Sequence, residues 1–303
     1  MQTIIESILR EVREDRTTPA VELMRKGVDA IAFFITHFTG TPTAFFNDLI
    51  RISEILIDAQ PSMAPFFHLA NTLLLAAEGH EDLEGVKEAS QEAIKNVVHH
   101  LQTSVEQISK IARGLIPEGA RVLTHSYSST VLKTLIDAKG EGRHFEVVCT
   151  ESRPMCEGFL LARKLSENRI KVRLEIDCAA PYTMKDIDVV LVGADCITPY
   201  GLVGKVGTYS LAVGAKEKGV HFYALCGTEK LLGSGMAKRY RILRKDPREV
   251  WPDVPRGVEV FNFYFDATPL NYLTSIFTEE GMLRGNEIIR RFQRVKVSRH
   301  FPD

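Results

Sequence analysis

The chain has 303 residues, of which 45% are hydrophobic, 25% charged and 8% aromatic, a composition typical of a globular protein of one or two domains. The 38 Lys and Arg residues nearly balance the 39 Asp and Glu residues, so the formal net charge is -1. Such a balance gives no long-range field that attracts polyanions, and we expect no nucleic acid and no membrane among the partners.

Residues 1–116 predict a helical domain. Apolar residues recur there at helical spacing in five stretches, 4–12, 21–34, 45–55, 61–77 and 83–116. The last stretch is long enough to form a spine between domains or a dimerisation surface. Because the start of the chain has no apolar core of signal-peptide length, and no segment has the roughly 18 uninterrupted apolar residues of a spanning helix, we expect a cytoplasmic protein.

Residues 117–303 predict a second, α/β domain. Short β-branched runs at 121–124, 145–150, 172–176, 188–193 and 222–226 alternate with helical stretches at 130–138, 158–166 and 208–218. This alternation indicates right-handed βαβ crossovers and a Rossmann-like, doubly wound, mostly parallel sheet. Ligands of such sheets bind beyond the carboxyl ends of the strands, so the residues that follow each strand are candidate site residues.

Hydroxyl side chains follow the first strand. Ser126, Ser128 and Ser129 stand just before or at the start of a helix. Hydroxyls at this position cap free backbone N–H groups, and the same N–H groups can bind a phosphate. The sequence leaves both interpretations open.

An arginine follows the second strand. Arg153 lies on a turn with Glu151, just before another helix. Its guanidinium could clamp a phosphate or pair with Glu151. We expect Arg153 to lie outside the core.

Asp195 follows the fourth strand, in a Gly-Ala-Asp turn. A carboxylate directly after a buried strand is either a structural cap or a catalytic acid or base. The residues alone do not separate these two roles.

A glycine-rich stretch leads from that turn into the next helix. It contains Gly201, Gly204 and Gly207 together with Lys205 and Thr208, and it resembles a phosphate-cradling loop in which Lys205 supplies charge. We expect Lys205, like Arg153, to lie outside the core. Because the stretch lacks the Walker spacing and follows the fourth strand, it does not match the fingerprints of ATP hydrolases or dinucleotide-binding proteins.

Five ordered motifs together resemble a known superfamily. They are Thr-His-Ser-Tyr-Ser at 124–128, Thr-Glu-Ser-Arg-Pro at 150–154, Gly-Ala-Asp at 193–195, Lys-Val-Gly-Thr at 205–208 and Phe-Asp-Ala-Thr-Pro at 265–269. The superfamily joins the alpha, beta and delta subunits of translation initiation factor 2B to two isomerases, which act on ribose-1,5-bisphosphate and methylthioribose-1-phosphate. The resemblance covers roughly residues 115–290 by motif.

The resemblance implies roles for two positions. In the isomerases a Cys at the end of the first strand and the Asp of the Gly-Ala-Asp turn transfer the protons that convert an aldose to a ketose. Asp195 matches that Asp, but Ser126 stands at the Cys position. A serine hydroxyl has a far higher pKa than a thiol at ~8.5, so it does not simply replace a thiol. Cys156 or Cys196, near the site in sequence, could take the role.

Two further departures concern ligand contacts. The superfamily commonly has Asn where this chain has Gly204, and the helical half lacks the Arg-Gly-rich turn by which the isomerases contact the substrate phosphate. Arg25-Lys26-Gly27 is only a weak echo of that turn. The regulatory alpha subunits also lack the thiol and are thought to sense sugar phosphates in this pocket, whereas the retained Asp195 favours catalysis.

We therefore interpret the chain as an initiation factor 2B alpha-like protein that binds a phosphorylated sugar or nucleotide and is catalytically weak or inactive. The alternative is an aldose–ketose isomerase, an intramolecular oxidoreductase that uses Asp195. A third possibility is an interaction protein with a vestigial pocket.

We also expect a homodimer and, as further partners, related regulatory subunits. The dimer would use apolar residues near the end of the α/β half, namely Phe261, Phe263, Phe265, Leu270 and Ile276. The five cysteines never show CxxC spacing, which argues against a zinc knuckle. We expect neither a metal ion nor a cofactor.

Overall fold

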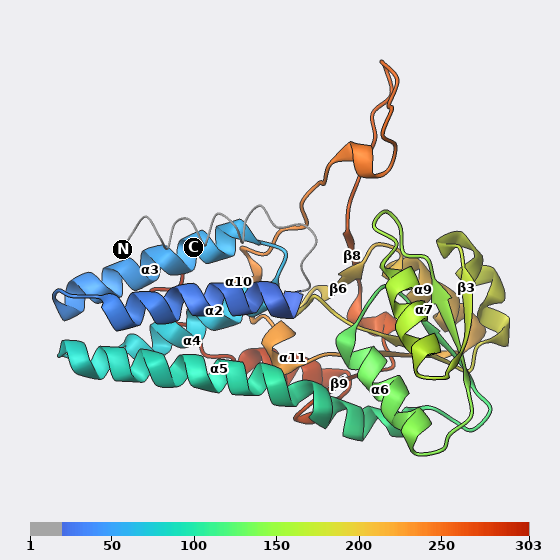
Figure 1. Ribbon diagram of the computed structural model, residues 1–303, viewed down its shortest axis with the longest axis horizontal. Helices are drawn as coiled ribbons and strands as arrows, with labels where there is room; N and C mark the ends of the chain where they lie inside the picture. Colours follow the sequence, from blue (N-terminus) through green and yellow to red (C-terminus); the bar gives the residue numbers. More distant parts are fainter. Residues whose placement is uncertain (1–19, 303) are drawn as a thin grey trace. The chain divides into compact units, whose positions relative to one another are not determined.

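A computed structural model describes residues 20–302 of the chain (Figure 1). Two compact units are present. Among the described residues, one unit comprises residues 20–103, 232–241 and 293–302, and the other comprises residues 104–231 and 242–292. The helix predicted over residues 4–12 lies outside the described residues.

The first unit is helical, and the other four predicted helices are confirmed. They are α2 (Ala20–His37), α3 (Pro42–Ala59), α4 (Ala64–Ala77) and α5 (Leu83–Ala112), whose last residues from Ser104 belong to the second unit. The short α10 (Ser234–Ala237) also belongs to the first unit. Thr41 caps α3, because its side chain accepts the Ala44 N–H at 3.2 Å. Arg25-Lys26-Gly27 lies inside α2 and forms no turn. Among residues 20–302, no helix combines the length and apolar character that crossing a membrane requires.

The C-terminal segment is tied to the helical unit by polar contacts. The Asn71 side chain donates to the Lys296 carbonyl oxygen at 2.8 Å and accepts the Ser298 N–H at 2.9 Å. Ser298 Oγ donates to a Glu78 carboxylate oxygen at 2.5 Å. These bonds explain why the last residues belong to the helical unit although the α/β unit precedes them in the chain.

The second unit contains a seven-stranded sheet in the order β10-β9-β7-β4-β1-β2-β3. Its strands are β1 (Arg121–Thr124), β2 (Glu146–Thr150), β3 (Lys171–Glu175), β4 (Val189–Val192), β7 (His221–Leu225), β9 (Ser275–Thr278) and β10 (Gly281–Leu283). Neighbouring strands are parallel except β9 and β10. The longer helices are α6 (Ser129–Gly140), α7 (Glu157–Glu167), α9 (Thr208–Lys218) and α11 (Asn286–Gln293). The doubly wound α/β fold is therefore confirmed.

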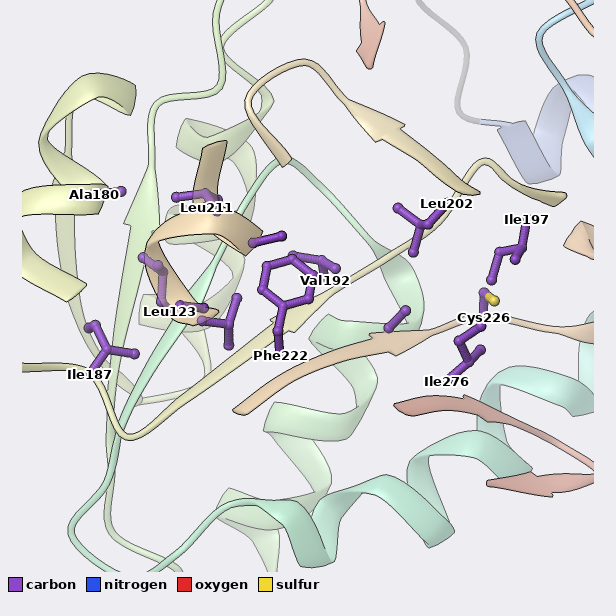
Figure 2. Close-up of a cluster of buried hydrophobic side chains, with 14 of the residues drawn as sticks. Leu123, Ala180, Ile187, Val192, Ile197, Leu202, Leu211, Phe222, Cys226 and Ile276 are labelled. Atoms are coloured by element: carbon purple, nitrogen blue, oxygen red, sulfur yellow. The ribbon is translucent and has the colours of Figure 1, made fainter. Parts of the chain in front are cut away.

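The central strands of the sheet are buried on both faces, which is why they read as continuous apolar runs, whereas the edge strand β3 is largely exposed. On β4, Val189 and Leu191 join the core beneath α6 and α7, whereas Val190 and Val192 join the core beneath α9 and the short α8 (Ala180–Thr183) (Figure 2). Ile276 on β9 is fully buried in this second core. Its predicted place in a dimer surface is therefore wrong.

A small second sheet replaces the loop that the sequence predicted. Strands β5 (Cys196–Thr198), β6 (Gly201–Lys205) and β8 (Phe265–Thr268) pair antiparallel in the order β5-β6-β8. Gly204 and Lys205 thus lie in a buried strand, and only residues 206 and 207 form the turn into α9. The prediction failed because β6 is stabilised by pairing with a strand sixty residues further along the chain, which local pattern does not reveal.

Candidate functional site

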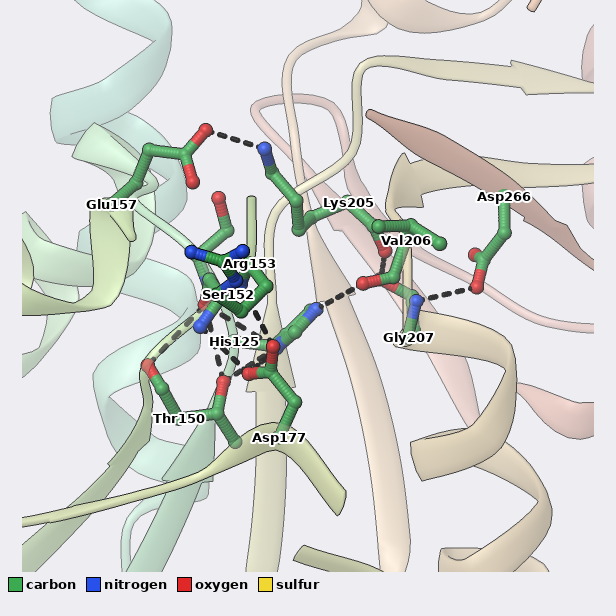
Figure 3. Close-up of polar contacts among 12 residues, drawn as sticks. His125, Thr150, Ser152, Arg153, Glu157, Asp177, Lys205, Val206, Gly207 and Asp266 are labelled. Carbon is green, nitrogen blue, oxygen red and sulfur yellow. Dashed lines mark hydrogen bonds and ion pairs between the residues drawn. The ribbon is translucent and has the colours of Figure 1, made fainter. Parts of the chain in front are cut away.

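The polar residues that the sequence placed after the strands gather at one edge of the large sheet. β1 lies between β2 and β4 and is parallel to both, so their carboxyl ends meet at this edge. Ser126 follows β1, Ser152 and Arg153 follow β2, and Asp195 follows β4. Figure 3 shows the polar contacts that connect much of this edge.

A buried histidine links the first two strands to the turn before α9. His125 Nε2 lies 2.8 Å from the Val206 carbonyl oxygen, and Nδ1 lies 2.5 Å from Thr150 Oγ1 (Figure 3). A carbonyl can only accept, so Nε2 carries the proton and Nδ1 accepts from the threonine. Burial lowers the pKa of His125, so the ring is neutral. A Cβ at Gly207, whose φ is +108°, would lie 3.0 Å from Nε2, so the turn requires glycine.

Ser126 and Ser152 both adopt left-handed backbone conformations. Their φ angles are +64° and +65°, which is unusual for serine and concentrates at functional sites. The Ser126 N–H donates to Ser152 Oγ at 2.7 Å. The N–H groups of Ser152 and Arg153 donate to the two carboxylate oxygens of Asp177 at 2.7 and 2.8 Å. Asp177 therefore holds the turn after β2, and Ser152 of that turn holds the turn after β1.

Asp195 is partly accessible after the end of β4. Burial of its carboxyl raises the pKa of Asp195, and the positive charges of Lys230 and Lys205 oppose that rise. Lys230 ends the short 3-10 helix η4 (Thr228–Lys230), just beyond β7. Sequence analysis missed Lys230, although β7 is parallel to β4 and ends at the same edge.

The N-terminus of α6 keeps hydrogen-bond donors available. Ser128 Oγ accepts the Val131 N–H at 3.3 Å, so Ser128 is the N-cap. The amides of Ser129 and Thr130 have no intrahelical acceptor, as at the start of any helix. A Cβ at Gly193 would lie 2.7 Å from Ser128 Oγ, so the turn after β4 packs directly on this helix end.

The N-terminus of α9 is already occupied. Asp266 Oδ2 accepts the N–H groups of Gly207 at 2.7 Å and Tyr209 at 3.2 Å, while Thr208 Oγ1 donates to the Lys205 carbonyl oxygen at 2.5 Å. The Lys205 ammonium forms an ion pair with Glu157 and is 7% exposed. The expectation that Lys205 lies outside the core is wrong, because its charge is balanced inside the protein.

Arg153 is exposed, as expected. Its guanidinium forms no ion pair with the Glu151 carboxylate within the described residues. Its Nη2 donates to the Val250 carbonyl oxygen at 3.0 Å. The described residues therefore place Arg153 beside the site with a neutral partner, which leaves its charge uncompensated.

Comparison with known proteins gives the family. The profile of the Initiation factor 2 subunit family matches residues 5–285. The chain belongs to this family. A ribose 1,5-bisphosphate isomerase of Methanocaldococcus jannaschii is 32% identical over 262 residues, covering 85% of this chain and 83% of that protein. A methylthioribose-1-phosphate isomerase of Geotalea uraniireducens is 33% identical over 267 residues, covering 81% and 77%.

A solved structure of the family agrees with the fold. The translation initiation factor eIF-2B of Pyrococcus horikoshii OT3 superposes with a TM-score of 0.76 at 29% identity, covering 92% of this chain and 96% of that chain. Members of the Initiation factor 2 subunit family thus include proteins named as initiation factors and proteins named as isomerases. Family membership alone does not choose between these functions.

The structure gives the two candidate cysteines of this family member different surroundings. Cys196 is fully buried in β5, and burial raises the pKa of its thiol well above the usual value. Cys156 is half-buried at the N-cap position of α7, where its side chain forms no capping hydrogen bond, and its Sγ lies 3.8 Å from the Pro154 carbonyl oxygen. Besides Lys230, the contacts single out His125, Asp177, Glu157 and Asp266, to which sequence analysis gave no role.

Proposed function

We propose that the chain is a cytoplasmic protein that binds a phosphorylated sugar or nucleotide at the carboxyl edge of the large sheet, with weak or no isomerase activity. The observation that carries the proposal is the open N-terminus of α6, packed against the turn that bears Asp195, with Ser126 at the position where the resemblance implies a thiol.

Binding is supported by the donors at this edge. The free amides of Ser129 and Thr130 point along the helix axis, where the helix dipole also favours an anion. Lys230 supplies positive charge near Asp195. A phosphate at the N-terminus of α6 would place the attached sugar beside the Asp195 turn. Gly193 of that turn packs against the side chain of Ser128, the N-cap of α6.

Weak catalysis is supported by the chemistry of Ser126, His125 and Cys196, three side chains considered as proton-transfer partners of Asp195. Aldose–ketose conversion moves one proton from C2 to C1 and another between the two oxygens, so it requires groups that exchange protons near neutral pH. The Ser126 hydroxyl has too high a pKa for this exchange. Both ring nitrogens of His125 are engaged, and the Cys196 thiol is buried.

The alternative function is an aldose–ketose isomerase of the ribose-1,5-bisphosphate or methylthioribose-1-phosphate type. One observation favours it specifically: burial raises the pKa of Asp195, as catalytic carboxyl groups require. In this case Asp195 would carry a proton to or from the sugar, and Lys230 would stabilise the oxygen on which negative charge develops.

Two measurements separate these functions. A ligand that binds only the native state stabilises it by RT ln(1+[L]/Kd), about 2.7 kcal/mol at a concentration of 100 Kd, so sugar phosphates should raise the Tm. NMR in deuterated solvent should show no deuterium entering the sugar. Rapid deuterium incorporation that Asp195→Asn abolishes would establish the isomerase instead. The absence of any Tm shift would leave only the interaction protein with a vestigial pocket.

We further propose that the protein acts as a homodimer, and that related regulatory subunits are its further partners. Exposed aromatic side chains of the α/β unit support an interface there, because Trp251 and Phe261 are 46% and 55% exposed. Light scattering at micromolar concentration should give twice the mass of one chain, and a monomer would contradict the dimer.

A further inference from the structure

The N-terminus of α9 is a second position at this edge that can hold an anion, and the Asp266 carboxylate occupies it. One oxygen of Asp266 accepts the N–H of the N-cap residue Gly207 at 2.7 Å and the N–H of Tyr209, in the first turn of α9, at 3.2 Å. This arrangement is the one by which a helix N-terminus holds a phosphate or other anion. A phosphate could bind these amides only by displacing Asp266.

The positive charge nearest this helix end, that of Lys205, is also balanced by a carboxylate of the chain. The Lys205 ammonium forms an ion pair with Glu157 Oε1, and it lies 5.0 Å from the centre of the Tyr264 ring (Figure 3 shows the ion pair). Because Lys205 is 7% exposed, solvent screens this pair weakly. The charges of Lys205, Glu157 and Asp266 sum to -1, so this end of the site repels a second phosphate.

Glu157 also presents an unsatisfied acceptor. Its second oxygen, Oε2, is buried and makes no hydrogen bond within the described residues. A buried acceptor without a partner is costly unless a ligand or water satisfies it. A sugar hydroxyl can donate to this oxygen, whereas a phosphate at neutral pH is mainly an acceptor and is repelled.

The Lys205–Glu157 pair lies near the Asp195 turn, because the Asp195 N–H donates at 2.9 Å to the carbonyl oxygen of Val203, two residues before Lys205 on β6. Lys205 lowers and Glu157 raises the pKa of Asp195, and both also act on His125. A ligand that contacts Asp195 therefore lies in the field of the Glu157 carboxylate.

We propose that the site selects a sugar with one phosphate and rejects the corresponding bisphosphate. The phosphate binds at the N-terminus of α6, and sugar hydroxyls donate to Glu157 Oε2 at the other end. Glu157 and Asp266 are thus specificity-determining residues. This inference rests on the proposed binding function and names its ligand class.

Calorimetry on the whole protein tests the selection. We expect the tighter of ribose-1-phosphate and ribose-5-phosphate to bind wild type at least tenfold more tightly than ribose-1,5-bisphosphate. If the bisphosphate binds as tightly or more tightly, the selection is refuted while the proposed binding function stands. If none of the three binds, the proposed function fails and the selection fails with it.

Charge-neutral variants test the residues. Glu157→Gln keeps the shape and removes the charge, so it should raise the affinity for the bisphosphate roughly tenfold and lower that for the monophosphate. The matched control is Glu167→Gln on the same helix, where Glu167 is exposed and pairs with Lys164 at 3.4 Å; it should change neither affinity. Circular dichroism checks folding. If Glu157→Gln does not fold, Asp266→Asn, which can still accept the Gly207 N–H, serves the same test. An unchanged preference in a folded variant overturns the assignment.

Discussion

Two helix N-termini at one sheet edge differ in whether a carboxylate of the chain binds their backbone amides. α6 begins behind Ser128 with its next two amides available, whereas α9 begins behind Gly207 with its amides bound to Asp266. In sequence, the second end looks the better phosphate site, because it has glycines and a lysine. A carboxylate 59 residues beyond Gly207 reverses that order. A glycine-rich basic pattern therefore identifies a helix end that can hold an anion, but not which anion it holds.

The largest expected effect is a gain of activity beside the open helix end. Ser126→Cys should raise isomerisation of methylthioribose-1-phosphate by 10²- to 10⁴-fold, the typical contribution of one proton-transfer group. Cysteine tolerates the left-handed backbone of this position about as well as serine, so the turn should persist. The ketose product is measured by NMR.

The gain should depend on Asp195. Adding Asp195→Asn to Ser126→Cys should return the rate to the wild-type level, and no gain in the single variant would refute the thiol argument. Gly204→Asn, which would restore the asparagine common in the superfamily, can then be combined with Ser126→Cys. A Cβ at Gly204 would lie 3.2 Å from Thr208 Oγ1 and 3.3 Å from Leu202 Cδ2, so this change requires small shifts.

The Lys205–Glu157 pair near the N-terminus of α9 should contribute more to the free energy of unfolding than to ligand binding. Lys205→Ala removes one partner of a buried ion pair and should lower the free energy of unfolding by about 3–5 kcal/mol. Arg153→Ala removes an exposed cation and should change it by less than about 0.5 kcal/mol. Urea denaturation measures both, and equal small effects would show that the Lys205–Glu157 pair is not structural.

A carboxylate placed at the open end should make it resemble the filled one. Ser129→Asp in the first turn of α6 should weaken ribose-5-phosphate binding by roughly 10- to 30-fold through repulsion of the phosphate. Ser210→Asp, also exposed and in the first turn of α9, is the matched control and should change the affinity less than about threefold. Similar losses in both variants would mean that the two ends are equivalent.

The smallest expected effect concerns the stability contribution of Asp195. Its folded pKa is raised by burial, so the ionised carboxylate opposes folding at neutral pH and the protonated form does not. Asp195→Asn should therefore be more stable than wild type at pH 7.5. The difference should shrink as the pH falls through the folded pKa and vanish below the unfolded pKa of about 3.9. Urea titrations across this range measure it, and a less stable variant at pH 7.5 would contradict the burial argument.

Sequence predicted the parts of the molecule that local pattern controls. The strands at 121–124 and 188–193 were predicted within one residue, because strands buried on both faces give unbroken apolar runs. The parts it missed depend on distant pairing. Neither the pairing of β6 with β8 nor the Asp266 cap on α9 has a local signature.

The same limit applies to the site. Strand ends predicted Ser126 and Asp195 at one edge because parallel topology alone brings them together. The contacts of His125 with Thr150 and Val206 depend on side-chain packing across three segments, and no spacing rule encodes them. Lys205 was interpreted as a phosphate ligand because its actual partner, Glu157, lies 48 residues away in the chain, and the sequence gives no sign that the two side chains meet.

A crystal structure with ribose-5-phosphate tests the central claim most directly. We expect the phosphate at the start of α6, with its oxygens about 3 Å from the amide nitrogens of Ser129 and Thr130. Asp266 should remain on the amides of Gly207 and Tyr209. A phosphate at the start of α9 with Asp266 displaced, or bound at neither helix end, would contradict the account.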